Sequence, residues 1–248
     1  MQRLYRIDNV DALRKMATLS SIHCIIQSMT EVPEDDLWLT ETECTVLKGL
    51  HFPKRRAEWR LGRWTAKRLI RNYLKKCKEP LPAKIEIRAA EDGAPEIFFD
   101  TRPAQMTLSI SHTRGRGFCA ISPKNIALGC DLEWIEPRSE AFIQDFFTAG
   151  ERQHLKESPP EQHDRFANLI WSAKESALKA LREGLRRDTR SVEVISYSED
   201  ETTDWKPLQV RCLQSGQVFS GWWRDEEQYL QTLVSDSIFP KPVNMQNL

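Results

Sequence analysis

The sequence lacks both a long apolar run and an excess of one charge. Its 36 lysines and arginines balance 36 aspartates and glutamates, so attraction of the whole molecule to nucleic acid or to an anionic membrane is not expected. No apolar run approaches the roughly 20 residues that a transmembrane helix needs, and the first six residues lack the apolar core of a signal peptide. We therefore expect a cytoplasmic protein that binds neither nucleic acid nor a membrane.

Paired cysteines are also absent. The six cysteines are scattered without a C-x-x-C pair, and several lie inside apolar strand patterns. This pattern favours reduced, buried thiols over a disulfide framework or a zinc site. What the chain does have is the composition of a globular protein, with 40% hydrophobic and 29% charged residues among 248. A chain of this length can form one large domain or two small ones.

Hydrophobic periodicity indicates two halves with the same order of elements. In the first half an apolar strand at residues 22–27 precedes a long helix at about residues 55–78, and four strand candidates follow. In the second half a strand at residues 126–135 precedes helical segments at about residues 139–157 and 164–183, and four more strand candidates follow. The order strand, long helix and meander thus occurs twice.

This order predicts an α+β fold of two similar lobes related by a pseudo-twofold duplication. Each lobe would be a long helix packed on a small, mainly antiparallel sheet, because the connections are too short for helical crossovers. The lobes would comprise residues 1–125 and 126–248, with the functional site between them. The duplication would be one of topology, since no residue-level repeat is expected. The segment after Phe239 is expected to be a disordered tail.

Two carboxylates lie two residues apart at the end of a predicted strand. Side chains at positions i and i+2 of a strand share a face, so Asp131 and Glu133 of the G-x-D-x-E segment project together. Such a pair suits magnesium, which prefers oxygen ligands and leaves positions open for phosphate. A D-x-E pair by itself is more often an exposed strand face, so the assignment needs further support.

The predicted helix at about residues 164–183 provides that support, because a lysine lies inside the apolar stripe of its segment 170–181. Lys174 is three residues from Trp171, where it must reach either the edge of the stripe or a buried anion such as a docked phosphate. Glu175 and Lys179 lie four apart beside the stripe. They form either a surface pair worth about 0.3–0.5 kcal/mol or part of a centre that binds a metal ion and phosphate.

The first half contains a strongly basic helix. Between Lys54 and Lys76 there are ten basic residues and a single acid, Glu58. This helix is either a solvated basic face or a collar for phosphate groups. The basic residues that share one helical face are Arg56, Arg60, Arg63 and Lys67.

The order and spacing of these motifs resemble the 4'-phosphopantetheinyl transferase family. The match is to the long, single-chain type that activates non-ribosomal peptide and polyketide synthetases. The pattern is Ser-x-Ser-His at residues 109–112, then G-x-D-x-E, then Trp-Ser-x-Lys-Glu-Ser-x-x-Lys some forty residues later, at residues 171–179. The resemblance covers about residues 56–194. It implies magnesium-dependent transfer of the phosphopantetheine arm of coenzyme A to a serine hydroxyl of an apo carrier protein, releasing adenosine 3',5'-bisphosphate.

The resemblance also implies roles for the acids and the lysines. Asp131, Glu133 and Glu175 would bind magnesium, and Glu175 or a metal-held water would take the proton of the serine. Lys174 and Lys179 would face the diphosphate of coenzyme A and its leaving group. Such a reaction needs positioning and charge neutralisation more than covalent help from the protein.

Further contacts to coenzyme A follow from the same resemblance. Ser111 and His112 would lie against its 3'-phosphate, although a lone histidine at a strand end is more often a structural hydrogen-bonding residue. Arg60 would bind the phosphates, with Lys54 and Arg56 as weaker candidates.

Two positions and the oligomeric state complete the expectations. In the family a glutamate after a Phe-Phe pair approaches the centre, and Glu151 takes that place here. The family's Gly-Lys-Pro turn is Gly93-Ala94-Pro95 in this chain, so a lysine is missing and the affinity for coenzyme A would be lower. Because two lobes of one chain could form the whole site, we expect a monomer.

Two other functions fit parts of the sequence. The basic helix and the Arg-Gly-Arg-Gly segment at residues 114–117 suit a nucleic-acid-binding module, although the zero net charge argues against it. The D-x-E pair with a distant glutamate also suits a metal-dependent nuclease. A gain of mass on a carrier protein distinguishes the transferase from both.

Overall fold

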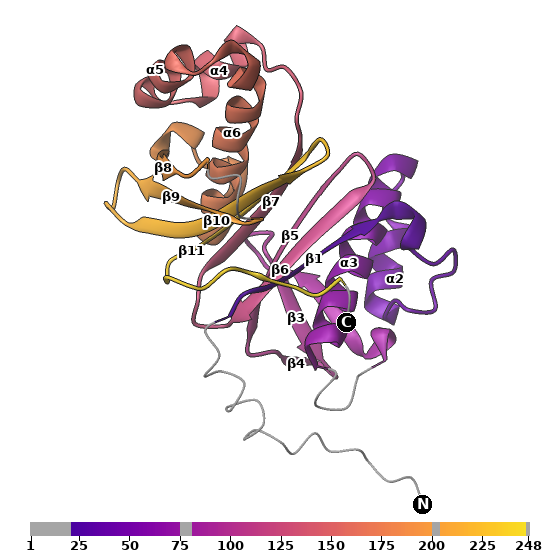
Figure 1. Ribbon diagram of the computed structural model, residues 1–248. Helices are drawn as coiled ribbons and strands as arrows, with labels where there is room; N and C mark the ends of the chain where they lie inside the picture. Colours follow the sequence, from indigo (N-terminus) through magenta and orange to yellow (C-terminus); the bar gives the residue numbers. More distant parts are fainter. Residues whose placement is uncertain (1–20, 75–80, 200–203, 247–248) are drawn as a thin grey trace, which may run out of the picture.

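The computed structural model describes residues 21–74, 81–199 and 204–246. Within these ranges the chain is an α+β protein with two long helices and three β-sheets, which confirms the predicted fold class (Figure 1). The start of the chain, the predicted helix end at residues 75–78 and Cys77 lie outside the described residues. None of the described helices is both long enough and apolar enough to cross a membrane.

Residues 21–74 and 81–123, which we call the first lobe, are built around a long helix. The elements of this lobe are β1 (His23–Ser28), α2 (Glu41–Lys48), α3 (Pro53–Leu74), β2 (Ile85–Ala89), β3 (Pro95–Phe99), β4 (Arg102–Pro103), β5 (Met106–Thr113) and β6 (Arg116–Pro123). The apolar side of α3 packs on β1, β5 and β6, and Ala66, Leu69 and Ile70 are fully buried there. The three strands pair antiparallel, with β6 in the middle.

The second lobe is built around the other long helix. Its elements are β7 (Leu128–Trp134), α4 (Glu140–Phe146), α5 (Ala149–Glu157), α6 (His163–Ala180), β8 (Val192–Tyr197), β9 (Lys206–Cys212), β10 (Val218–Glu226) and β11 (Tyr229–Ser235). Helix α6 lies on β7 and β11, and Ala173, Ala177 and Leu178 are fully buried there.

Short 3-10 helices connect the elements of both lobes. They lie at Met29–Glu31, Pro82–Lys84, Pro160–Gln162, Gly184–Arg186 and Thr189–Ser191.

The two lobes meet where edge strands β5 and β7 run beside each other, between α3 and α6 (Figure 1). The larger sheets have strand orders β12-β1-β6-β5 and β7-β11-β10-β9-β8, and the small sheet is β2-β3-β4. Side chains join the two edges, because the amide of Cys130 donates to Ser109 Oγ at 2.9 Å and Ser111 Oγ donates to Asp131 Oδ1 at 2.8 Å. Residues on these strands are therefore held at the interface between the lobes.

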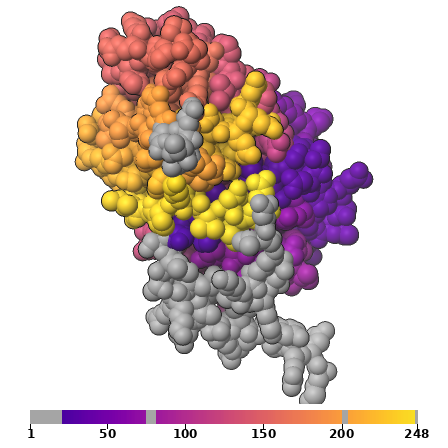
Figure 2. Space-filling view, in the orientation of Figure 1, coloured from indigo at the N-terminus to yellow at the C-terminus, as the bar shows by residue number. Residues whose placement is uncertain are grey.

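The segment after Phe239 is ordered as far as it is described, so the expectation of a disordered tail is wrong. Strand β12 (Val243–Asn244) pairs parallel with β1 of the first lobe. Met245 is buried, and its carbonyl accepts a hydrogen bond from Asn72 Nδ2 at 2.9 Å. The space-filling view shows this segment in yellow against the indigo first lobe (Figure 2). Burial of apolar side chains and backbone pairing hold it in place.

Candidate functional site

Asp131 lies at the centre of a polar cluster between the lobes. Its side chain is 2% exposed, and its Oδ1 accepts hydrogen bonds from Ser111 Oγ at 2.8 Å and from Lys179 Nζ at 2.7 Å. Its Oδ2 accepts a hydrogen bond from Ser172 Oγ at 2.8 Å. The donors come from β5 and α6, so elements of both lobes orient this carboxylate.

A glycine explains why helix α6 approaches so closely. A Cβ atom at Gly129 would lie 1.8 Å from the carbonyl oxygen of Ser176 and 2.8 Å from the amide nitrogen of Ala180. Only a residue without a side chain fits between β7 and α6 at this point. The glycine of G-x-D-x-E is thus required by packing, and the close contact brings Lys179 to Asp131.

Two glutamates complete the acidic cluster. Glu133 accepts hydrogen bonds from Trp171 Nε1 at 3.1 Å and from Arg138 Nη2 at 2.8 Å. Glu175 lies one helical turn from Lys179, with 3.7 Å between its Oε2 and the Nζ atom. The three predicted acids are therefore brought into one region, each with a basic partner.

Burial and mutual repulsion shape the electrostatics of this cluster. Burial, assisted by the charge of Asp131, raises the pKa of Glu133 to about 7 and that of Glu175 to about 7. Burial disfavours the charged form of Lys179. The negative charges of Asp131 and Glu175 outweigh this effect and hold the pKa of Lys179 above its usual value. The three carboxylates of the cluster pair with only two cations, Lys179 and Arg138.

A hard divalent cation would supply the missing positive charge, and carboxylate oxygens are its preferred ligands. By charge and donor chemistry, the acidic cluster therefore fits magnesium. Over the residues that the structure describes, however, no group of three or more histidine, cysteine, aspartate or glutamate side chains is arranged so that it could hold a metal ion. The carboxylates pair with Lys179 and Arg138 instead. Convergence of the three acids on one ion stays a prediction.

A cavity of about 470 Å³ opens beside this cluster, and we call it the phosphate cavity. From the second lobe it is lined by Glu175 and Lys179, and from β5 by Ser111 and His112. Helix α3 contributes Arg55, Glu58, Trp59, Gly62 and Arg63. The structure thus brings the predicted Ser-His pair and two residues of the α6 motif to one cavity with a basic wall.

Arg60 and Arg56 are committed elsewhere and are not among the described residues that line the phosphate cavity. Arg60 Nη2 donates to the backbone carbonyls of residues 33–35, and its Nε lies 3.0 Å from Asp36 Oδ1. Arg56 Nη1 donates to the carbonyls of residues 47 and 50. Both guanidinium groups hold loops against α3, so the predicted role of Arg60 in binding coenzyme A is not supported by its contacts.

Arg55 and Arg63 line the phosphate cavity. The sequence placed Arg63 on the basic face of this helix, but it did not single out either arginine as a contact to coenzyme A. Together with Trp59 they repeat every four residues along α3, and the guanidinium carbon of Arg63 lies 4.5 Å from the Trp59 ring centroid. The neighbouring Gly62 also lines the cavity, and α3 lies close to β5 there, because a Cβ atom at Gly62 would lie 3.2 Å from the Ile110 side chain. Lys54 is the third basic residue that was predicted to contact coenzyme A. Its side chain is 87% exposed, and its Nζ lies 3.8 Å from Glu58 Oε1.

Lys174 does not reach the phosphate cavity. Its side chain is completely buried, and its Nζ donates to Glu151 Oε2 at 2.6 Å and to the carbonyl of Val192 at 2.7 Å. In this structure Lys174 therefore pairs within the second lobe and does not face the phosphate cavity, where the diphosphate was expected. Glu151 is 3% exposed and pairs with this lysine, away from the acidic cluster.

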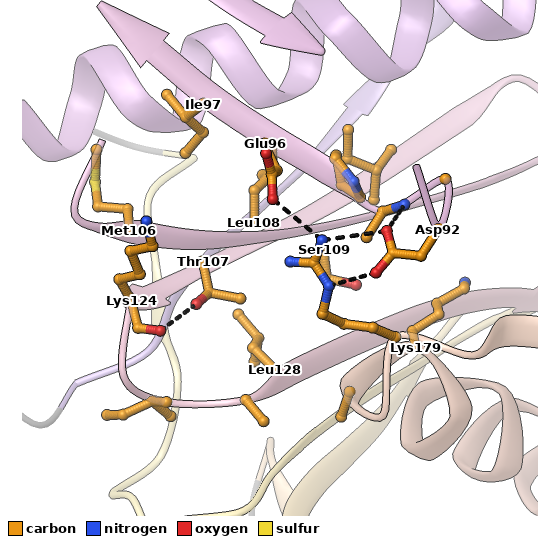
Figure 3. Close-up of a pocket in the computed structure, with 18 of the residues that line it drawn as sticks. Asp92, Glu96, Ile97, Met106, Thr107, Leu108, Ser109, Lys124, Leu128 and Lys179 are labelled. Atoms are coloured by element: carbon orange, nitrogen blue, oxygen red, sulfur yellow. Dashed lines mark hydrogen bonds and ion pairs between the residues drawn. The ribbon is translucent and has the colours of Figure 1, made fainter. Parts of the chain in front are cut away.

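A second cavity, of about 540 Å³, is also lined by the Gly93-Ala94-Pro95 turn. Figure 3 shows this cavity with Asp92, Glu96 and Lys179 among the residues that line it. It is lined mostly by apolar side chains, and Lys179 reaches both cavities. Arg182 closes one side by donating from Nε to Asp92 Oδ2 at 2.6 Å and from Nη2 to Glu96 Oε1 at 3.1 Å. The turn that lacks the family's lysine is therefore tied to the second lobe by an arginine.

Comparisons with known proteins agree with the geometry. Residues 127–233 match the model of the 4'-phosphopantetheinyl transferase superfamily. The 4'-phosphopantetheinyl transferase HetI of Nostoc is 26% identical over 151 residues, which are 60% of this chain and 62% of that protein. The 4'-phosphopantetheinyl transferase of Bacillus subtilis is 33% identical over 119 residues, which are 47% of this chain and 50% of the relative.

Among solved structures, the holo-[acyl-carrier-protein] synthase of Thermotoga maritima matches with a TM-score of 0.36 and 17% sequence identity. That match covers 52% of this chain and 76% of the other. The match over residues 127–233 confirms, for that part of the chain, the family resemblance found in the sequence. The alignments with the Nostoc and Bacillus proteins span 62% and 50% of those relatives.

Proposed function

We propose that this chain is a magnesium-dependent 4'-phosphopantetheinyl transferase, which moves the phosphopantetheine arm of coenzyme A to a serine hydroxyl of an apo carrier protein. The observation that carries the proposal is the phosphate cavity, where Ser111 and His112 of one lobe face Glu175 and Lys179 of the other. The superfamily match over residues 127–233 supports it.

The basic wall of the phosphate cavity suits a ligand with several phosphate groups. Arg55 and Arg63 would bind phosphates through their planar guanidinium groups, with Ser111 and His112 completing the contacts to the 3'-phosphate. Lys179 would neutralise the diphosphate beside the acidic cluster. Because Arg56, Arg60 and Lys67 of α3 are engaged within the chain, this helix is less suited to nucleic acid than its composition suggests.

Asp131, Glu133 and Glu175 would hold magnesium, which when bound neutralises charge on the diphosphate. Lys179 and Arg138 now satisfy Asp131 and Glu133, so each would exchange a carboxylate for another partner as the metal binds. Lys179 would then be free to pair with phosphate oxygens.

Glu175, or a water held by the metal, would take the proton of the incoming serine. The position of the Glu175 side chain supports this role, because it lines the phosphate cavity and is 16% exposed. The serine oxygen forms a bond to the phosphorus that carries the pantetheine arm. The anhydride bond to the other phosphate breaks, and adenosine 3',5'-bisphosphate leaves. Carrier docking would place the hydroxyl in line with the phosphorus.

We further propose that one chain forms the complete site, as a cytoplasmic monomer whose two lobes, residues 1–125 and 126–248, are related by a pseudo-twofold duplication. Contacts at the cluster come from both lobes, which supports a site within one molecule. The carriers would be acyl or peptidyl carrier domains, including those of polyketide and non-ribosomal peptide synthetases.

The decisive experiment incubates the chain with coenzyme A, magnesium and several apo carrier domains, and then measures the mass of each carrier. We expect a gain of one phosphopantetheine group that disappears when magnesium is chelated or when the acceptor serine is replaced. An unchanged mass across all carriers would count against the proposal. Plasmid or RNA cleavage that Asp131→Ala abolishes would favour the nuclease instead.

A further inference from the structure

A buried ion pair ties together three elements of the second lobe. Lys174 on α6 donates to Glu151 Oε2 at 2.6 Å and to the carbonyl of Val192 at 2.7 Å, and both charged side chains are almost completely buried. The other oxygen of Glu151 accepts a hydrogen bond from the amide of Val194 in β8 at 2.9 Å. One lysine and one carboxylate thus connect α6, α5 and β8.

The same glutamate also caps the N-terminus of helix α5. Glu151 is the third residue of the helix, and its Oε2 accepts a hydrogen bond from the amide of Thr148 at 2.9 Å. In return the amide of Glu151 donates to Thr148 Oγ1 at 3.2 Å. This capping box fixes where α5 begins, so the lysine is held against a rigid partner.

The first lobe contains the same arrangement. Lys67 on α3 is fully buried, and its Nζ donates to Glu43 Oε2 and to the carbonyl of Trp38 at 2.9 Å. The other oxygen of Glu43 accepts a hydrogen bond from the amide of Ile87 in β2 at 3.1 Å. Here the pair connects α3, α2 and the strand that follows α3.

The capping box is repeated too. Glu43 is the third residue of α2, its Oε2 accepts a hydrogen bond from the amide of Thr40 at 2.9 Å, and its own amide donates to Thr40 Oγ1 at 3.2 Å. We call the two arrangements the first clasp, Lys67 with Glu43, and the second clasp, Lys174 with Glu151. They differ in the carbonyl that each lysine contacts.

The clasps correspond to a repeat in the sequence. Trp64-Thr65-Ala66-Lys67 in α3 corresponds to Trp171-Ser172-Ala173-Lys174 in α6, and each follows a Thr-x-x-Glu helix start. The expectation of no residue-level repeat is therefore wrong. The shared residues are few and far apart, and their relation is evident only when the lysine and the glutamate are seen to meet.

Burying a lysine and a glutamate is costly, and a pair of this kind adds little stability over apolar residues of similar size. Its effect is geometric. On a helix each residue turns by about 100°, so fixing one side chain fixes the direction of its neighbours. The second clasp holds Lys174, whose neighbour Glu175 lines the phosphate cavity, and the first clasp holds Lys67, one helical turn from Arg63.

We infer that the two clasps are positioning devices for different walls of the phosphate cavity. The second clasp directs Glu175 and Lys179 toward the reacting phosphate, and the first clasp directs Arg63 and Arg55 toward the remote phosphates of the substrate. Lys174 and Glu151 are thus positioning residues that act through Glu175 and Lys179. This inference rests on the proposed transferase activity.

The test of the second clasp compares Lys174→Met with the double variant Lys174→Met/Glu151→Gln. The single variant leaves a buried carboxylate without its cation, whereas glutamine in the double variant can still close the capping box. We expect kcat to fall about 10²-fold in Lys174→Met and to recover at least about tenfold in the double variant. If Lys174 instead contacted the diphosphate, the double variant would be as slow as the single one, which would overturn the inference.

The first clasp is tested in the same way with Lys67→Met and Lys67→Met/Glu43→Gln. We expect the KM for coenzyme A to rise about tenfold in Lys67→Met with kcat nearly unchanged, and to recover in the double variant. Lys84→Met and Lys156→Met, at exposed lysines of the two lobes, are the matched controls and should change neither parameter. Equal effects of the two clasps on kcat would overturn the division of roles.

Amide hydrogen exchange separates this inference from the proposed activity, because it needs no substrate. In Lys174→Met the amide of Val194 should exchange faster while that of Ile87 is unchanged, and Lys67→Met should show the reverse. Unchanged exchange at both amides would disprove the clasps even if transfer occurs. Conversely, an inactive wild-type chain with the expected exchange pattern would disprove the transferase and leave the clasps standing.

Discussion

Helices α3 and α6 share a short motif but present different charged side chains to the cavity between them: α3 contributes two arginines and one glutamate, and α6 contributes one glutamate and one lysine. After the clasp lysine, α6 continues with Glu175, whereas α3 continues with Arg68. The α3 residues lining the cavity include Arg55 and Arg63, while the acidic cluster gathers beside α6. A substrate with several phosphates needs cationic side chains, and a divalent cation needs carboxylates. The two helices therefore use the same kind of buried lysine and glutamate pair to support different groups, arginines on α3 and acids beside α6.

The strands that precede these helices also differ in charge, because only the strand before α6 carries acidic side chains. Strand β7 carries Asp131 and Glu133 after Cys130, whereas β1 carries Ile25 and Gln27 after Cys24. The first lobe thus has a corresponding strand, helix and clasp but lacks the acids on the strand. We therefore expect a single metal-binding centre in each chain.

The largest effect should come from the acidic wall. Asp131→Ala removes the carboxylate that both lobes orient and leaves Lys179 without its strongest partner, so we expect kcat/KM to fall by about 10³-fold or more. The measurement is the initial rate of carrier modification at saturating magnesium. Thermal unfolding of the variant is the control, and full activity of a folded Asp131→Ala protein would remove the acids from the mechanism.

Loss of the cation on the same wall should be somewhat less severe. Lys179→Met keeps the length of the side chain but removes the ammonium group that lines both cavities, and we expect kcat to fall about 10²-fold. Single-turnover kinetics with a saturating carrier measure the effect. A change confined to the KM for coenzyme A would assign Lys179 to substrate binding only.

The basic wall is best probed by two arginines of α3 that face different ways. Arg63→Ala should raise the KM for coenzyme A about tenfold with kcat retained, because Arg63 lines the cavity and would contact a part of the substrate remote from the reacting phosphorus. Arg60→Ala is the matched variant, and it should leave this KM within about twofold while lowering the melting temperature. The opposite ranking of the two KM values would restore Arg60 as the ligand.

The smallest of these effects is expected at the mouth of the phosphate cavity. His112 is exposed there, so His112→Ala should raise the KM for coenzyme A only about threefold, by loss of one partly solvated contact. Dephospho-coenzyme A, which lacks the 3'-phosphate, provides the check. The variant and the wild type should have the same KM for it, and a persisting difference would mean that His112 does not meet the 3'-phosphate.

The secondary structure was largely predictable from the sequence, because periodicity records which side of an element is buried. The long helices, the strand that ends in Asp131 and Glu133, and the strand that leads to Ser111 were all expected near their observed positions. The final strand was not, since Val243–Asn244 is held by a distant partner, β1, and two-residue strands carry no periodic signal.

Within the candidate site, the sequence by itself determined which residues could carry the chemistry: the acids Asp131, Glu133 and Glu175, and the Ser-His pair. Local spacing placed Asp131 and Glu133 on one face of a strand, because side chains at i and i+2 share a face whatever the strand packs against. The family resemblance added Glu175 and the Ser-His pair. Only the tertiary structure decided where the long basic side chains go. A lysine such as Lys174 inside an apolar stripe can meet a substrate or a carboxylate of its own chain, and that choice depends on Glu151, which another helix supplies.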